Sequence, residues 1–296
     1  MTERVTVRDG LVNVDKPAGW TSHDVVAKTR KIAGTRKVGH AGTLDPMATG
    51  VLLLGIGRGT KLVGHLALTD KVYETTIRLG ATTVTDDAEG ELIASADASA
   101  VGSEALHAQV AALTGRIQQV PSAVSAIKSG GVRAYERVRA GETVELEARP
   151  VTVYRFEVTG TRATETFLDV DATIECSSGT YIRAIARDLG AALGVGGHVT
   201  ALRRTRVGPY DLSSASTLDE LAAQFVVTPL AEVAAASFPR LDVDAVTATS
   251  VAHGVPLPPT GLGPGPVAVF GPDGTLLSLV TDRGDRAKHL TVFATP

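Results

Sequence analysis

The stretch Gly39-His-Ala-Gly-Thr-Leu-Asp-Pro-Met-Ala-Thr-Gly50 holds one carboxylate, Asp45, among small and apolar neighbours. Pro46 keeps the residue before it out of helical geometry, and the glycines allow a ligand to approach the backbone closely. An aspartate in this setting can cap a turn, act as a general base or act as a nucleophile. The sequence offers no second carboxylate at glycosidase spacing, no HExxH and no serine or cysteine nucleophile motif. On the residues alone, a turn or a cap is the favoured role of Asp45.

The segments on either side of this stretch predict regular structure. Val51–Ile56 is a continuous apolar run, which predicts a buried strand. Leu11–Val14 predicts a short strand that stops at the turn of Lys16-Pro-Ala-Gly19. Ser22 is predicted to cap a helix that runs to about Ala33 and ends at a glycine.

The middle of the chain alternates in the manner of half-buried strands. Val72–Leu79 predicts one strand, and Val151–Thr159 and Phe167–Cys176 predict two more that pair across a turn at Gly160. Apolar residues at helical spacing predict a long helix from about Thr180. Two further helices are predicted, at Glu104–Thr114 and Val132–Ala140. Because no βαβ unit repeats, we expect an α+β fold with a mixed, mainly antiparallel sheet and flanking helices.

The composition changes after about Ser237. Five prolines fall within Val255–Pro266 and precede three strand patterns, Val267–Phe270, Leu276–Thr281 and His289–Phe293. This predicts a small, β-rich C-terminal module of about 60 residues.

Composition also limits the class of protein. The 296 residues include one cysteine, Cys176, which excludes an internal disulfide framework and a paired-cysteine zinc site. The N-terminus lacks an apolar signal core, and the longest clean apolar stretch, Val51–Gly57, is too short to cross a bilayer. We therefore expect a folded, cytoplasmic protein with no membrane association.

The net charge of the chain hides an uneven distribution of basic and acidic residues along the sequence. The 29 basic and 32 acidic residues give a net charge of −3, which speaks against a polyanionic partner. However, residues 15–71 contain nine basic and only four acidic residues, and acid collects in Asp86–Glu91 and Glu142–Glu147. A separated basic face is what phosphate contacts require, although solvated surface charge is the plain alternative.

A second glycine-rich stretch, Gly55-Ile-Gly-Arg-Gly-Thr-Lys61, follows a predicted strand and is similar to a phosphate-binding loop. The dinucleotide fingerprint requires glycine where Thr60 stands, and the spacing of the P-loop fails as well. A tight turn that leaves a buried strand is therefore the favoured interpretation. A nucleotide-dependent oxidoreductase is the alternative that this stretch leaves open.

Several motifs, met in order along nearly the whole chain, resemble the TruB-type tRNA pseudouridine synthases, which act on the T-loop uridine at position 55. The stretch Gly39–Gly50 resembles the catalytic motif of that family. The other matching segments are Val14-Asp-Lys-Pro-Ala-Gly19, Lys71-Val-Tyr73, Gln119-Val-Pro-Ser-Ala-Val-Ser-Ala-Ile-Lys128, Ala148-Arg-Pro150, Ser178-Gly-Thr-Tyr-Ile-Arg183, Asp188-Leu-Gly190 and Leu202-Arg-Arg204. Their details resemble actinobacterial members.

The resemblance implies roles for individual residues. It implies that Asp45 is the catalytic nucleophile or base, and that Tyr73 stacks on a uracil flipped out of the RNA. It further implies that Tyr181 and Leu202 line the same pocket and that Arg183 pairs with the catalytic carboxylate.

The resemblance also implies residues around the reacting base. His40 would occupy the place that the base vacates in the T-loop. Lys16, Pro17, Gly39 and Gly42 would support the catalytic loop without taking part in the reaction.

The organisation implied by the resemblance is a pseudouridine synthase domain in residues 1–236 and a PUA-like RNA-binding domain in residues 237–296. A thumb-like insertion is implied at about residues 121–150. The reaction would need no cofactor and no metal, and the partner would be the T-stem-loop of tRNA, bound by a monomer without any protein partner. A catalytically silent RNA-binding or RNA-folding protein on the same fold is the alternative. The presence of Asp45, Tyr73 and Arg183 favours an active enzyme over this alternative.

Overall fold

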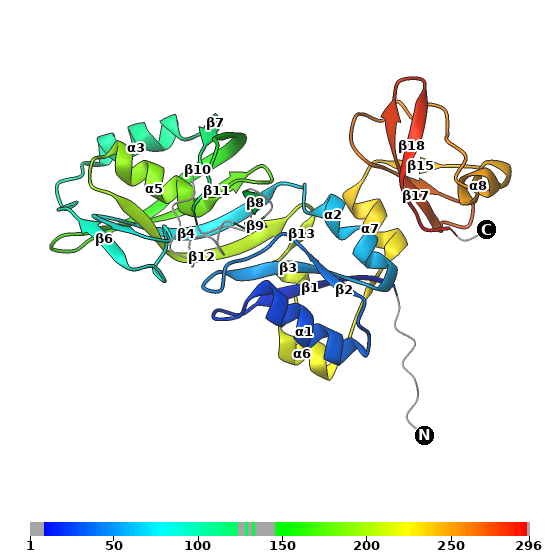
Figure 1. The fold of residues 1–296 in the computed structure, drawn as a ribbon, viewed down its shortest axis with the longest axis horizontal. Helices are drawn as coiled ribbons and strands as arrows, with labels where there is room; N and C mark the ends of the chain where they lie inside the picture. Colours follow the sequence, from blue (N-terminus) through cyan, green and yellow to red (C-terminus); the bar gives the residue numbers. More distant parts are fainter. Residues whose placement is uncertain (1–8, 124–127, 130–131, 134–145, 295–296) are drawn as a thin grey trace. The chain divides into compact units, whose positions relative to one another are not determined.

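The computed structural model describes residues 9–123, 128–129, 132–133 and 146–294, which form two compact units (Figure 1). Unit 1 comprises Met1–Pro46, Val51–Ala67 and Gly208–Pro296. Unit 2 comprises Met47–Gly50 and Leu68–Val207.

Unit 2 is built on an antiparallel sheet in the order β12-β4-β11-β10-β7. Its strands are β4 (Lys71–Leu79), β7 (Gly115–Gln119), β10 (Arg149–Ala163), β11 (Leu168–Cys176) and β12 (Gly197–Val207). The first two residues of β3 (Thr49–Ile56) pair in parallel with Arg203 and Arg204 of β12. These pairings confirm the prediction of a mixed, mainly antiparallel sheet.

One face of this sheet is apolar and supports helix α5 (Ile182–Ala192), which packs on β12. The pleat sends Val170 and Ile174 of β11 to that face, and both are fully buried. The remaining elements of unit 2 are α3 (Ser103–Ala112) and the two-stranded pairs β5 (Ala81–Thr83) with β6 (Leu92–Ser95) and β8 (Lys128–Ser129) with β9 (Val132–Arg133).

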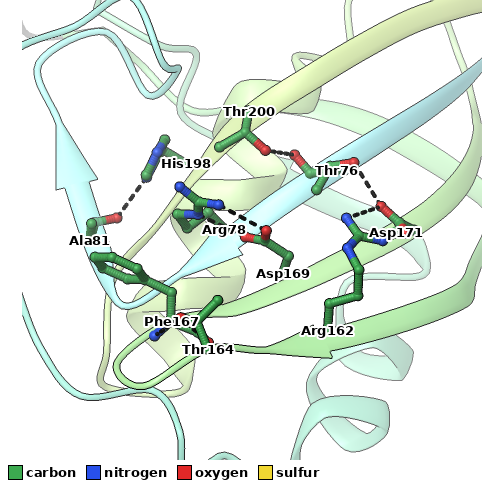
Figure 2. A network of polar contacts seen from close by, with 10 residues as sticks. All are labelled: Thr76, Arg78, Ala81, Arg162, Thr164, Phe167, Asp169, Asp171, His198 and Thr200. Carbon is green, nitrogen blue, oxygen red and sulfur yellow. Dashed lines mark hydrogen bonds and ion pairs between the residues drawn. The ribbon is translucent and has the colours of Figure 1, made fainter.

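The opposite face of the sheet is polar, and Figure 2 shows its side chains linked across the strands. Arg78 of β4 donates two hydrogen bonds to Asp169 of β11, at 2.7 and 2.8 Å. Arg162 of β10 pairs with Asp171, which also accepts a hydrogen bond from Thr76. Such cross-strand pairs let one face of an antiparallel sheet remain in water.

Unit 1 holds strands in the order β14-β1-β3, with β2 antiparallel to β3. Its first strand, β1 (Gly10–Lys16), pairs with β14 (Thr228–Pro229), more than 200 residues away in the sequence. Along the same strand, the Asp15 amide donates to the Ser216 carbonyl at 2.9 Å. The other elements before residue 240 are α1 (Ser22–Ala33), β2 (Val38–Ala41), η1 (Gly57–Lys61), α2 (Val63–Leu66), β13 (Tyr210–Asp211), η2 (Leu212–Ser214), α6 (Leu218–Ala223) and α7 (Leu230–Ser237).

The C-terminal part has its own sheet, in the order β15-β16-β17-β18, as the sequence predicted for a separate β-rich module. Its elements are β15 (Arg240–Asp242), α8 (Ala245–Ala252), β16 (Val267–Phe270), β17 (Leu276–Arg283) and β18 (Arg286–Val292). Val251, Val267 and Val280 belong to a hydrophobic cluster confined to this module. Two side chains of η1 reach it, because Arg58 and Lys61 donate to the carbonyls of Phe293 and Val292, each at 2.9 Å.

Three local predictions need correction. The turn between β10 and β11 does not lie at Gly160, which pairs with Asp171 inside the ladder; β10 continues to Ala163, further than the alternation indicated. The helix α1 is capped by Thr21 rather than Ser22, since Thr21 and Asp24 form a reciprocal capping box. Val132–Arg133 form a strand rather than the start of a helix, and the rest of that predicted helix lies outside the described residues.

The stretch Gly55–Lys61 is the tight turn that the sequence favoured. Gly55 and Ile56 end β3, and Gly57–Lys61 form the 3₁₀ helix η1; a side chain at Gly55 would overlap the backbone of Gly59. A side chain at Gly59 would in turn overlap the carbonyl group of Gly10. The space beside these glycines is therefore filled by the protein's own backbone and not left open for a ligand.

Candidate functional site

Asp45 lies in the loop between β2 and β3, and it is half-buried. The residue before it, Leu44, is 4 % exposed. The hydroxyl of Ser22 accepts a hydrogen bond from the Leu44 amide at 2.9 Å and donates to the Leu44 carbonyl at 3.1 Å. Ser22, the first residue of α1, thus fixes the backbone immediately before the carboxylate.

The residue after Asp45 is fixed as well. Lys16 is fully buried at the end of β1, and its ammonium group donates to three carbonyls, those of Pro17 at 2.9 Å, Trp20 at 2.6 Å and Pro46 at 3.1 Å. The amide of Gly19 donates to the same Pro46 carbonyl at 2.8 Å. A buried ammonium requires such partners because three unmet donors in a low-dielectric interior are costly. The Lys16-Pro17 turn and the loop of Asp45 are therefore tied together.

The two glycines of the loop differ. Gly42 has a φ of 79°, a left-handed conformation that other residues rarely adopt. Gly39, in β2, has room for a side chain, since an added Cβ would meet only the Thr60 methyl group at 3.8 Å. His40 follows in the same strand, half-buried, with its ring edge-on to that of His23 at a centroid distance of 5.5 Å.

The predicted aromatic and apolar site residues of unit 2 share one face of its sheet. Tyr73 of β4 is 7 % exposed and stands between Ile174 of β11 and Arg204 of β12. Leu202 of β12 is 8 % exposed and stands opposite Thr75. Helix α5 packs on this same face of the sheet.

Tyr181 is the residue that precedes α5, and its backbone is held by a buried glutamine. The Tyr181 amide donates to the Gln119 side-chain oxygen at 2.8 Å, and the Gln119 amide group donates back to the Tyr181 carbonyl at 3.1 Å. Gln119 is 1 % exposed. Gln119 occurs in one of the motifs quoted above, but no local pattern indicates this contact.

Arg183, the second residue of α5, is 4 % exposed and faces the acidic loop after β5. Its guanidinium donates to the Thr85 carbonyl at 2.6 Å and lies 3.4 Å from the Asp87 carboxylate, which is equally buried. Asp87 also accepts hydrogen bonds from the Thr85 hydroxyl and the Glu89 amide, at 2.5 and 3.0 Å. Asp87 was missed at the sequence level, where it appeared only as one member of an acidic segment.

A second arginine of α5 meets the same loop. Arg187 lies 3.4 Å from Asp86 and donates to the Val120 carbonyl at 2.7 Å. Asp86 has a φ of 59°, and burial raises the pKa of its carboxyl group. The loop is thus shaped around the two arginines of the helix.

Burial also shifts the pKa values of Lys71, the first residue of β4, and of its register partner Cys176, the last residue of β11. Burial, followed by the charge of Arg204, lowers the pKa of Lys71 to about 8, and burial raises the pKa of the Cys176 thiol to about 11. The described residues contain no group of three or more His, Cys, Asp or Glu side chains that would hold a metal ion. Within the same residues, no helix is long and apolar enough to span a membrane.

We expect Cys176 to be unreactive in the folded protein. At pH 8, a thiol of pKa about 11 is ionised in about one molecule per thousand, and only the thiolate reacts. A disulfide-exchange reagent should therefore titrate no thiol in native protein and one thiol in denaturant. Stoichiometric reaction within minutes under native conditions would show that Cys176 is accessible.

The polar face of the unit 2 sheet carries an open hollow of about 580 Å³. Thr76, Asp171 and Thr200 of the network in Figure 2 line it, together with Arg203 and Glu74. Arg203 donates there to the Thr49 hydroxyl at 3.2 Å. Several side chains that line the hollow are hydrogen-bonded across the strands, and Leu202 is the one lining residue that the sequence placed in a catalytic pocket.

Comparison with known proteins gives matches along the whole chain. The profile of the TruB family pseudouridylate synthase N-terminal domain matches residues 30–182. The tRNA pseudouridylate synthase B C-terminal domain matches residues 183–235, and the C-terminal domain of tRNA pseudouridine synthase II matches residues 238–294.

Individual relatives are similar over their full length. The tRNA pseudouridine synthase B of Thermobifida fusca is 61 % identical over 290 residues, which cover 97 % of this chain and 99 % of that protein. The protein of the same name from Streptomyces griseus is 62 % identical over 299 residues, or 99 % and 100 % of the two chains. A chain in the crystal structure of a Cbf5-Nop10-Gar1 complex superposes with a TM-score of 0.75 at 26 % identity, covering 98 % of this chain and 86 % of that one.

Proposed function

The chain belongs to the TruB family of pseudouridylate synthases, and from that premise we propose that it isomerises the T-loop uridine of tRNA, at position 55, to pseudouridine. The observation that carries the proposal is the match over 97 % of the chain to a relative named tRNA pseudouridine synthase B. The geometry around Asp45 supports it, because the residues on both sides of this carboxylate are fixed by buried side chains.

The proposed reaction moves one bond and changes no oxidation state. The bond between the sugar carbon C1′ and N1 of uracil breaks, the base turns, and C1′ bonds to C5. The proton on C5 is lost while N1 gains one, so substrate and product have the same composition. The reaction therefore requires a carboxylate that acts as nucleophile or base, which we assign to Asp45, and it needs no cofactor or metal.

The other site residues are assigned by their match to the family's motifs. We propose that Tyr73 stacks on the flipped uracil, with Tyr181 and Leu202 beside it, while Arg183 keeps the reactive carboxylate ionised. Burial of Tyr73 and Leu202 on one sheet face supports a pocket that excludes water. His40 is assigned to the gap that the flipped base leaves in the loop.

Lys16, Pro17, Gly39 and Gly42 are proposed to hold the loop in shape. The three carbonyls that Lys16 contacts support this assignment for the Lys16-Pro17 turn. The positive φ supports it for Gly42, whereas Gly39 shows no comparable backbone requirement.

We further propose a catalytic domain in residues 1–236 and an RNA-binding, PUA-like domain in residues 237–296, acting together as a cytoplasmic monomer. The separate hydrophobic cluster of the C-terminal module supports this boundary. The thumb-like insertion at 121–150 falls largely outside the described residues.

The decisive experiment incubates an unmodified tRNA transcript with the protein and maps pseudouridine by chemical labelling and primer extension. One new pseudouridine, at the T-loop position, is expected. A transcript with that uridine replaced by cytidine is the matched control. Tight binding without any pseudouridine would instead support the silent RNA-binding alternative, and product at another position would refute the T-loop assignment.

We expect Tyr73→Leu to reduce the single-turnover rate far more than the affinity for tRNA. Phosphate contacts dominate RNA affinity, whereas stacking on one base contributes about 1–3 kcal/mol. Tyr73→Phe is the control, because it keeps the ring and should retain most of the rate. Equal losses of rate and affinity in the leucine variant would contradict the assignment.

A further inference from the structure

Four cationic side chains, three of them fully exposed, gather where helix α1 ends. Lys28, Arg30 and Lys31 lie on its last turns, and Arg36 follows Gly34, whose φ of 63° closes the helix. Arg30, Lys31 and Arg36 are exposed and Lys28 is partly so. We call these four residues the α1 cation surface.

Arg116, Arg149 and Arg283 are exposed without an ion pair among the described residues, but most exposed arginines elsewhere in that part of the chain form one. Their pairs include Arg58 with Asp9, Arg155 with Glu157, Arg240 with Asp242 and Arg286 with Asp285. Among the described residues, no acidic side chain pairs with Lys28, Lys31 or Arg36. Since the whole chain carries a net charge of −3, this gathering of unpaired cations is local.

One acid of α1 and one acid of α6, the helix that packs on it, are already engaged in capping. Asp24, the one acid of α1, completes the capping box with Thr21. In α6, which packs on α1, Glu220 completes a second capping box with Thr217. Lys37 is different, because its charge helps to lower the pKa of Asp9, and for that reason it is left out of the surface.

Helix stability accounts for only part of the cluster. Cations in the last turn favour a helix because they face its negative end, which explains Arg30 and Lys31. Arg30 also donates to the Val38 carbonyl at 3.1 Å and so has a structural task. Lys28 lies before that turn and Arg36 lies beyond the helix, where neither effect applies.

The surface is continuous with a proposed RNA contact. His23, at the start of α1, is exposed and touches the ring of His40. His23, Ala27 and Lys31 are spaced by four residues, so they share one exposed face of the helix. At a rise of 1.5 Å per residue, Lys31 lies about 12 Å from His23 along the helix axis.

We propose that the α1 cation surface binds backbone phosphates of the tRNA whose loop His40 contacts. This inference rests on the proposed function and extends it to a second area of RNA contact. Flexible, unpaired lysines and an arginine beside a nucleic-acid site are suited to phosphates, which fix the position of an RNA without reading its sequence. Lys31 lies about 12 Å along the helix from His23, so its contact falls on RNA outside the flipped nucleotide.

The test is the salt dependence of tRNA binding by the triple variant Lys28→Gln, Lys31→Gln, Arg36→Gln. Arg30 is kept because of its bond to Val38. Each phosphate contact contributes about 0.7–0.9 to the slope of log K against log salt. Between 50 and 200 mM salt, the wild type should therefore lose about 20- to 40-fold more affinity than the variant.

The matched control is Arg155→Gln, Arg240→Gln, Arg286→Gln, which removes the same charge from exposed but ion-paired sites. It should keep the slope of the wild type, and both triple variants should unfold at temperatures close to that of the wild type. Equal slopes for wild type and α1 variant would overturn the proposal, as would an equal change in the control. An unchanged slope together with loss of binding to an acidic protein would assign the surface to a protein partner instead.

Failure of the wild type to bind tRNA at all would overturn the proposed function along with this surface. Normal wild-type binding and pseudouridine formation, with no difference between the slopes, would overturn the surface alone.

Discussion

Asp45→Asn is expected to abolish pseudouridine formation, with a single-turnover rate at least about a thousandfold below that of the wild type. The amide is nearly the same size as the carboxylate but is neither a nucleophile nor a base of useful strength. Because Ser22 and Lys16 hold the neighbouring residues through backbone groups, the loop should keep its shape in the variant. Affinity for tRNA is therefore expected to stay within about tenfold of the wild type.

The control for this substitution is Asp97→Asn, the same chemical change at an exposed aspartate that caps the backbone of Ser99. It should leave the rate unchanged. Product formation by Asp45→Asn within a few-fold of the wild type would show that the reaction does not depend on this carboxylate.

The second large effect is expected at Arg183, which is buried with Asp87. Arg183→Met should lower the single-turnover rate by at least about a hundredfold, because it removes the positive charge that we propose keeps the reacting carboxylate ionised. It should also lower the free energy of unfolding by about 3 kcal/mol, since the Asp87 carboxylate then stays buried without its cation. Arg183→Lys should recover part of the rate, because an ammonium supplies charge without the planar fork of the guanidinium.

A double variant separates these two effects. Arg183→Met combined with Asp87→Leu removes both buried charges, and replacing a buried pair with apolar residues is often neutral for stability. We expect the double variant to regain most of the unfolding free energy and none of the rate. If stability and rate recovered together, Arg183 would serve the fold rather than the reaction.

The sequence predicted most of the regular structure because its rules are local. Glycine at position 34 ends α1, and apolar alternation locates β4 and β11. The incorrect predictions occur where a residue's conformation or contacts are set by a segment far away in the sequence. Gly160 is a good turn residue, yet pairing with β11 keeps it in a strand. Thr21 and Ser22 are equally good caps, and Ser22 is instead used to hold Leu44.

The site was predicted in part, for a related reason. The motifs locate Asp45, Tyr73 and Arg183 along the chain, but they do not say what each side chain touches. Asp87 and Gln119 act through contacts with residues 62 or more positions away, which no local pattern encodes. An acidic side chain beside the start of α5 becomes recognisable only when the helix and the loop are seen together.

The pairing of β1 with β14 has a consequence for biosynthesis. Leu11 and Val12 leave the ribosome early, whereas Thr228 and Ser216, which flank the same strand in the folded protein, come about 200 residues later. At translation rates of about 5–20 residues per second, the first strand waits about 10–40 s for these neighbours. Most of unit 2 is one continuous segment, Leu68–Val207, and is complete before they emerge. One edge of β1 therefore lacks its partners until residues 216–228 have been made, whereas β3, on the other edge, is synthesised soon after β1.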